Sequence, residues 1–142
     1  MYLKPASDDD FEFSWELFSE SVHPLITPYL PEGWNPEREK RQFSLIWRPS
    51  KTMIVQSDAS AIGWFSIDDA GASTVLENIF ICAPYRRLGI GSKIVSDIVR
   101  HAELAGKSVR LSLLRNNPCA PFYASLGFRT IASSKLTIDM ST

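Results

Sequence analysis

The segment Ala83–Ser92 constrains the fold of this chain most, because it joins a strand-like run to a helix through two glycines. The run before it, Ser73–Cys82, is rich in residues that favour strands. The segment after it, Gly89–Ala105, carries apolar residues at the spacing of one buried helical face. Those apolar residues are Ile90, Ile94, Val95, Ile98, Val99 and Ala102. The chain is therefore predicted to contain a strand, a tight turn and an amphipathic helix in direct succession.

The same junction is suited to binding an anion. Unpaired backbone amides and the positive end of the helix dipole meet at a helix N-terminus. Gly89 and Gly91 would let a phosphate approach the backbone, and Arg86 and Arg87 add charge and bidentate donors. The alternative is a tight turn whose glycines serve packing and whose arginines serve solubility. A dinucleotide-binding loop and a P-loop both fit poorly, since the third glycine and the Gly-Lys-Ser/Thr sequence are missing.

The N-terminal half is predicted to begin with an edge strand and two helices. Tyr2–Pro5 is short enough for an edge strand, and Asp8–Asp10 can cap a helix that should stop before Pro24. A second helix is expected from about Pro36 to Trp47, with proline at its first position.

The pattern in the rest of the chain predicts mainly strands. Residues 1–142 together are therefore predicted to form one α+β domain. An antiparallel meander is expected from three strands, at Thr52–Gln56, Ala61–Ile67 and Ser73–Cys82, with turns at residues 57–60 and 68–71. After the amphipathic helix we expect a strand at Val109–Leu114, a short helix at Pro118–Leu126, and strands near Phe128–Ile131 and Leu136–Met140.

Composition narrows the class of protein. A chain of 142 residues with 44% hydrophobic and 22% charged residues fits one globular domain. The net charge of −1 disfavours double-stranded nucleic acid as the main partner. No segment approaches the roughly 18 apolar residues of a membrane span, and the N-terminus lacks a signal peptide, so a cytoplasmic location is expected. Cys82 and Cys119 lack metal-ligand spacing; we expect no metal site and two reduced packing residues.

A second motif follows the helix and the next strand. Residues 116–128 read Asn-Asn-Pro-Cys-Ala-Pro-Phe-Tyr-Ala-Ser-Leu-Gly-Phe. Together with the Arg-x-x-Gly-x-Gly pattern of Arg86, Gly89 and Gly91, this order resembles the GNAT family of N-acetyltransferases. The resemblance covers residues from about 73 to 140, and the N-terminal half is compatible with it. One departure is Cys119, where the family commonly has alanine, and we expect it to pack.

The resemblance implies a GNAT-like α+β fold. Its sheet would be mixed, mostly antiparallel, built of six or seven strands splayed in the middle and flanked by about four helices. It also implies acetyl-CoA as the co-substrate, with its pantetheine arm paired to backbone groups of Ile79, Phe80 and Ile81, and with Asn116 in contact. The backbone amides expected to hold the pyrophosphate are those of Arg86, Arg87, Leu88, Gly89, Ile90, Gly91 and Ser92.

The implied reaction is direct attack of a primary amine on the thioester of acetyl-CoA. Because an amine with a pKa near 10.4 is neutral in only about one molecule in a few thousand at pH 7, a base or a water chain helps. Glu77 is the candidate base: several relatives carry a glutamate on this strand, and alternation puts Glu77 on the face of Ile79 and Ile81. A solvated or hydrogen-bonded carboxylate is the alternative for Glu77. Tyr123 resembles the tyrosine placed near the sulfur and is the candidate proton donor and cofactor contact, with packing beside Phe122 as its alternative. The amide of Ile81 would stabilise the oxyanion.

Histidines and tryptophans complete the candidates. His23 is expected to have a local capping role rather than to line the acceptor pocket, and His101 is expected to be solvated on the polar side of its helix. Trp34, Trp47 and Trp64 are expected in the core, with Trp34 the best pocket candidate.

Two other functions compete with catalysis. A non-catalytic acyl-CoA-binding regulatory module would keep the cradle without the chemistry. A protein-interaction domain could use the same fold, because a fold does not dictate function. The expected acceptor is a small-molecule amine or a peptide amine, and neither nucleic acid nor a membrane is expected as a partner. Homodimers are common in this family, which leaves a homodimer as a candidate assembly.

Overall fold

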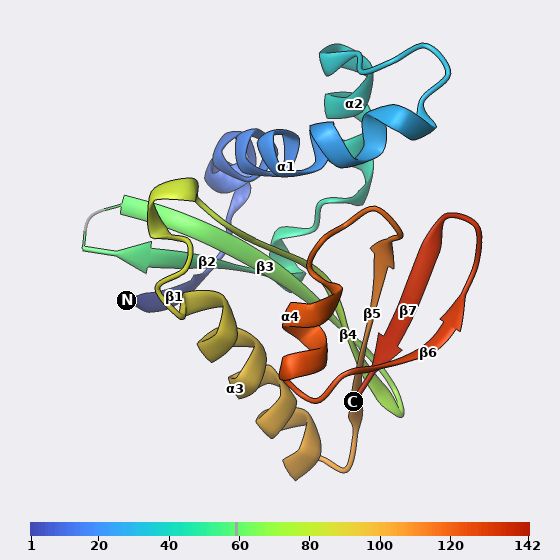
Figure 1. Cartoon of the computed structure of the whole chain (residues 1–142). Coiled ribbons are helices and arrows are strands. Elements are labelled where there is room, and N and C mark those ends of the chain that lie inside the picture. The colour runs from blue at the N-terminus through green and yellow to red at the C-terminus, as the bar shows by residue number, and fades with distance from the viewer. Residues whose placement is uncertain (59) are drawn as a thin grey trace.

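The computed structural model describes residues 1–58 and 60–142 and contains one seven-stranded sheet in the order β1-β2-β3-β4-β5-β7-β6 (Figure 1). The strands are β1 (Tyr2–Pro5), β2 (Thr52–Ser57), β3 (Ser60–Ala70), β4 (Ser73–Ile81), β5 (Ser108–Leu114), β6 (Arg129–Ser133) and β7 (Thr137–Ser141). The α-helices found in these residues are α1 (Phe11–Ile26), α2 (Pro36–Ile46), α3 (Ile90–Leu104) and α4 (Ala120–Ser125). The predicted α+β class is confirmed, with β1 at one edge. The turn predicted at residues 57–60 includes Ala59, which lies outside the described residues.

The sheet splits in the middle. Strands β1 to β4 pair antiparallel in sequence, and β5 pairs antiparallel with β7. The two halves meet in the parallel pair of β4 and β5, which spans only Ser73–Val75 and Ser108–Arg110. Beyond these residues the strands diverge toward α1 (Figure 1). We call the gap between residues 76–81 of β4 and 111–114 of β5 the wedge; it confirms the predicted splay.

Apolar side chains form one core on each face of the sheet. The larger core lies under α3 and α4 and includes Val95, Leu111 and Tyr123. The smaller core packs α1 and α2 against β2 and β3, and it contains Trp64, which is 1% exposed. The indole nitrogen of Trp64 donates to the carbonyl of Ser14 at 3.1 Å, so this buried donor has a partner. The core position predicted for Trp64 is confirmed.

Helix α1 continues past Pro24, where the sequence predicted its end. Pro24 lacks the N–H that would bond to the carbonyl four residues earlier, but it lies in the last turn, where one lost bond does little damage. Thr27 closes that turn, because its N–H and its hydroxyl both donate to the carbonyl of His23, the hydroxyl at 2.6 Å. The proline therefore falls inside the helix instead of ending it.

The hairpin between β3 and β4 is tighter than predicted. The sequence placed Asp68 and Asp69 in the turn, whereas β3 runs through them to Ala70. Each carboxylate has a cationic partner: Asp68 pairs with Lys51, and Asp69 with Lys107. The turn itself falls at residues 71–72, where Gly71 has a φ of +71°.

Gly63 lets β3 and β4 approach each other beside the wedge. A Cβ at this position would lie 2.5 Å from the carbonyl oxygen of Phe80 and 2.8 Å from Cδ1 of Ile81. We expect Gly63→Ala to destabilise the fold by about 2–4 kcal/mol, since backbone must move to admit it. Urea unfolding measures this as a lower midpoint. Gly91→Ala is the matched control, because its Cβ meets only Cζ of Phe122 at 3.7 Å; equal midpoints for the two variants would contradict the expectation.

Candidate functional site

The turn between β4 and α3 presents a run of unpaired backbone donors. The N–H groups of the residues from Arg87 to Ser92 donate to no acceptor in the described part of the chain, and the first helical bond runs from Lys93 N to Gly89 O at 3.0 Å. Arg87 and Gly89 are left-handed, with φ of 61° and 82°. Such a turn at a helix N-terminus gathers amides into a concave anion site. We call residues 86–92 the cradle.

Gly91 has no packing role that requires glycine. A Cβ there would make an ordinary contact of 3.7 Å with Phe122, and its φ is not positive. Gly89 differs, because its positive φ favours glycine. The packing alternative therefore accounts for Gly89 but not for Gly91, whereas close approach of a ligand accounts for both.

Arg86 fastens the cradle to the end of β4. Its Nε donates to the carbonyl oxygen of Ile81 at 2.7 Å. The side chain therefore sets the height of the cradle above the wedge, a role that the sequence motif did not reveal. The terminal nitrogens of Arg86 remain available to an anion. The bond from Nε also occupies the carbonyl oxygen of Ile81.

The edge of β4 that faces the wedge is formed by alternate residues. Cys82 N donates to Ile62 O of β3 at 2.8 Å, so the backbone of Cys82 points toward β3. Alternation then directs the backbone of Phe80 toward β3 and that of Ile79 and Ile81 toward the wedge. The prediction that Phe80 offers backbone groups to a pantetheine arm is corrected accordingly. Its ring instead joins the smaller core.

Tyr123 lies in α4 beneath the wedge. It is 7% exposed, and its ring packs edge-on against Phe122 and Phe128, with centroids 5.0 and 5.6 Å away. Its hydroxyl makes no hydrogen bond in residues 1–58 and 60–142. Burial, with a smaller contribution from Cys119, raises the pKa of Tyr123 to about 12. The phenol is therefore protonated at neutral pH and has a proton to donate.

Of the two cysteines near the cradle, Cys82 is partly buried and Cys119 is exposed, so the packing role predicted for Cys119 is wrong. Burial raises the pKa of both thiols, and the carboxylate of Glu20 raises that of Cys82 further. The guanidinium of Arg86 opposes the rise at both positions. Both side chains are therefore neutral thiols, and neither is an activated nucleophile.

Asn116 connects the two halves of the molecule. Its Nδ2 donates to the carbonyl of Leu25 in the last turn of α1 at 2.8 Å, while Asn117 caps the approach to α4 by accepting from Cys119 N at 2.9 Å. At the other side of the wedge, α1 contacts β4 through the rings of Phe18 and Phe80. Helix α1 thus spans the open end of the wedge. Asn116, the residue predicted to contact the cofactor, thus donates its side-chain amide to α1.

Glu77 occupies a β-bulge. The pairing of β3 with β4 steps from Ser66 opposite Asn78 to Ile67 opposite Leu76, which leaves Glu77 without a partner. An extra residue on one strand reverses the alternation of side chains beyond it.

The bulge turns Glu77 away from the face that alternation predicted. Leu76 shares the larger core with Ile79 and Ile81, whereas Glu77 faces α2 and pairs with Arg48, whose Nη2 lies 3.2 Å from Oε1. The predicted placement of Glu77 on the face of Ile79 and Ile81 is therefore wrong. Glu77 still lies at the base of the wedge, two residues beyond Val75, which is the last residue of β4 that pairs with β5.

The connection from α1 to α2 is held by a stack of rings. Trp34 lies between Trp15 and His23, with interplanar angles of 9° and 14° and centroids 6.2 and 4.5 Å away. The side chain of His23 therefore stacks and does not cap the helix. His101 is exposed on α3, as predicted.

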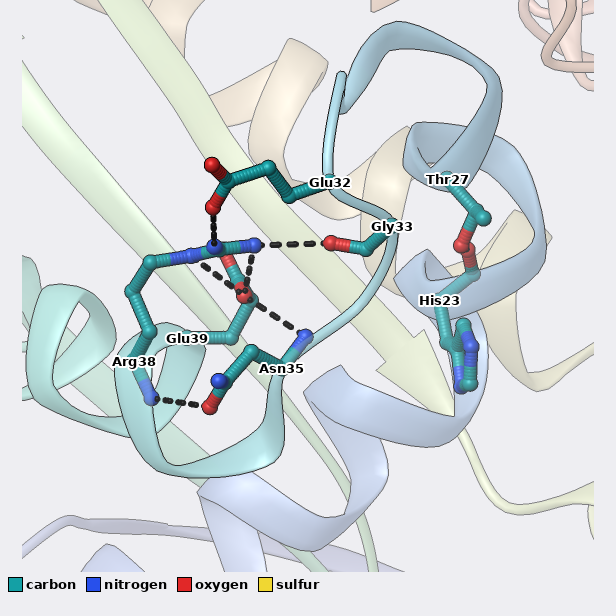
Figure 2. A network of polar contacts seen from close by, with 7 residues as sticks. All are labelled: His23, Thr27, Glu32, Gly33, Asn35, Arg38 and Glu39. Carbon is teal, nitrogen blue, oxygen red and sulfur yellow. Dashed lines mark hydrogen bonds and ion pairs between the residues drawn. The ribbon is translucent and has the colours of Figure 1, made fainter.

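A polar network fixes the same connection from the side of α2 (Figure 2). Arg38 donates through Nη2 to the carbonyl of Gly33 at 2.7 Å and pairs with Glu39 and Glu32. Asn35 caps α2 by accepting from Arg38 N at 3.0 Å. The sequence analysis did not single out these residues. Their contacts hold the connection between α1 and α2 in one conformation beside α1.

A second cavity, possible metal-ligand groups and possible membrane-spanning helices were also considered in the described ranges. A cavity of about 590 Å³ lies between α3 and strands β1 to β4, and none of the cradle residues lines it. Among residues 1–58 and 60–142, no group of three or more His, Cys, Asp or Glu is placed to hold a metal ion. No helix in those ranges is both long and apolar enough to cross a membrane.

Comparison with known proteins assigns the chain to a family. The sequence model of the acetyltransferase (GNAT) family matches residues 19–128. A comparison with curated protein sequences found no significant match.

Solved structures share the fold along the whole chain. PH1933 from Pyrococcus horikoshii OT3 superposes with a TM-score of 0.76 at 12% identity, over 99% of this chain and 96% of that one. An N-acetyltransferase from Staphylococcus aureus Mu50 gives 0.72 at 13%, with both chains fully covered. PaiA N-acetyltransferase from Thermoplasma acidophilum, solved in complex with coenzyme A, gives 0.69 at 16%, over 99% and 97%. At these identities the likeness establishes the fold.

Proposed function

This chain belongs to the GNAT family of acetyltransferases, and on that premise we propose that it transfers an acetyl group from acetyl-CoA to a primary amine. The amine attacks the thioester directly, without an acetylated enzyme. The observation that carries the proposal is the run of unpaired amides from Arg87 to Ser92 at the mouth of the wedge. It offers an anion site and, next to it, an open strand edge.

Coenzyme A fits both features. Its pyrophosphate is the kind of anion that a helix N-terminus binds, and Gly91 leaves room for it. An extended arm can add to the free edge of β4, where Ile79 and Ile81 direct backbone groups into the wedge. The complex of the Thermoplasma acidophilum relative with coenzyme A supports this assignment.

In the proposed mechanism, residues on the two faces of the sheet have separate tasks. Acetyl-CoA supplies the activated acyl group when bound. The amide of Ile81 or Ile79 would donate to the oxyanion that forms as the amine attacks, and the neutral hydroxyl of Tyr123 would protonate the departing sulfur.

Glu77 would take the proton from the acceptor amine. It lies at the base of the wedge on the face opposite Tyr123, so the proton donor and the proton acceptor act on different groups of one reaction. Its ion pair with Arg48 holds the carboxylate in place. The acceptor would then approach beside α1 and α2.

A turnover screen tests this proposal. Wild-type protein is incubated with acetyl-CoA and a panel of small amines, amino acids and peptides, and mass spectrometry detects acetylated products. We expect acetylation of at least one class of amine together with release of free coenzyme A. Binding of coenzyme A with no product across the panel would contradict catalysis and favour the regulatory module. Absence of binding would overturn both.

A further inference from the structure

A small polar cavity lies behind Glu77, on the face of the sheet covered by α2. Its volume is about 50 Å³, and it is bounded by the end of α2, the turn Pro49–Lys51 and strands β2 to β4. Aromatic walls come from Phe43 and Trp64. The lining residues that carry polar groups include Trp47, Arg48, Thr52, Ser66, Glu77 and Asn78.

Trp47 contributes a donor with no acceptor. Its indole Nε1 is sealed from solvent and has no hydrogen-bond partner in the part of the chain that the structure describes. The indole of Trp64, on the same face, donates to Ser14 O. A buried orphan N–H costs roughly 1–3 kcal/mol, and native structures usually satisfy such groups with protein or ordered water.

The cavity offers acceptors to match this donor. Among the described residues, the carboxylate of Glu77 is bonded only to Arg48, which leaves most of its lone pairs free. The hydroxyl of Thr52 donates to Arg48 O at 2.7 Å, and that of Ser66 accepts from Asn78 at 2.9 Å, so both oxygens keep spare capacity. A cavity with about 50 Å³ open to water-sized spheres accommodates a water, which needs roughly 10–15 Å³ by the same measure.

We propose that an ordered water fills this cavity, accepts a hydrogen bond from Trp47 Nε1 and donates one to the carboxylate of Glu77. Its second hydrogen is directed to Thr52 or Ser66. Because Glu77 has no partner across the bulge, its side chain is held by Arg48 and by this water. Trp47 is thus a positioning residue for Glu77. The presence of the water is independent of the activity; its effect on catalysis rests on the function proposed above.

Nuclear magnetic resonance tests the water directly in the wild-type protein. The indole Hε1 of Trp47 is expected to show a cross-relaxation peak with a long-lived water. Trp64 Hε1, which is bonded to Ser14 O, is the internal control and is expected to show none. If Trp47 behaves like Trp64, the cavity is dry and the proposal is overturned.

Two variants test the bridge to Glu77. Glu77→Leu removes the acceptor, so the water peak at Trp47 should weaken and its Hε1 resonance should shift. Trp47→Phe keeps a ring and removes the donor; kcat should fall about 3- to 10-fold, with KM for acetyl-CoA unchanged.

An unchanged Trp64 Hε1 resonance shows that each variant keeps its fold. An unchanged Trp47 resonance in Glu77→Leu overturns the bridge, and an unchanged kcat in Trp47→Phe overturns the positioning role. Absence of turnover in the wild type would instead count against the function, and the water test would stand.

Discussion

Gly91→Asp is expected to weaken coenzyme A binding strongly while leaving the fold intact. The residue lies inside the cradle, and a Cβ added there would make an ordinary contact of 3.7 Å with Cζ of Phe122. A carboxylate in front of unpaired amides would occupy the anion site and repel the pyrophosphate. Like charges in contact cost several kcal/mol, so Kd should rise by about 100-fold or more. Equilibrium binding of a fluorescent coenzyme A analogue measures the change.

Ser96→Asp is the matched control for this variant. It adds the same charge to the same helix at an exposed position, away from the N-terminus. We expect its Kd and its thermal midpoint to match those of the wild type. If Gly91→Asp also binds like the wild type, the cradle does not hold the pyrophosphate, and the tight-turn interpretation of residues 86–92 prevails.

Tyr123→Phe is expected to lower kcat by about 100-fold and to leave KM for acetyl-CoA nearly unchanged. General acid catalysis typically contributes 100-fold to 10,000-fold, roughly, and the variant removes the donor while keeping the ring that packs against Phe128. Steady-state kinetics with the best acceptor measures both constants. A variant as fast as the wild type would assign Tyr123 to packing alone.

The raised pKa of Tyr123 also predicts how stability depends on pH. Below pH 10 the phenol is neutral in both the folded and the unfolded chain, so it contributes no pH dependence. Above pH 10 the unfolded chain ionises first, because the folded pKa is about 12. Stability should therefore fall by roughly 2–3 kcal/mol between pH 10 and 12, a loss that Tyr123→Phe should lack. Urea unfolding of both proteins across this range isolates the difference; parallel curves would contradict the shift.

Local patterns explain why much of the fold could be predicted. The apolar stripe of α3 and the strand-favouring residues of β2 and β3 lie within each segment, and the structure places all three elements within a few residues of the expected bounds. The cradle is likewise local, since the glycines, the arginines and the start of α3 lie within one short stretch of chain. Such features depend little on what packs against them.

The features that could not be predicted depend on partners distant in sequence. The face of Glu77 follows from its register with β3, and its partner Arg48 lies in another element. Likewise, the direction of the Phe80 backbone is fixed by pairing with β3, and Asn116 meets Leu25 at a separation of 91 residues. A strand pattern cannot reveal a bulge, because the extra residue looks like any other until the partner strand is known.

A calorimetric titration of coenzyme A into the wild-type protein tests the central claim most directly. Pantetheine, which lacks the pyrophosphate, serves as the comparison ligand. Because the cradle amides would bind the pyrophosphate, we predict saturable one-to-one binding of coenzyme A, tighter than that of pantetheine by about 100-fold or more. No saturable binding, or equal affinity for the two ligands, would contradict the account.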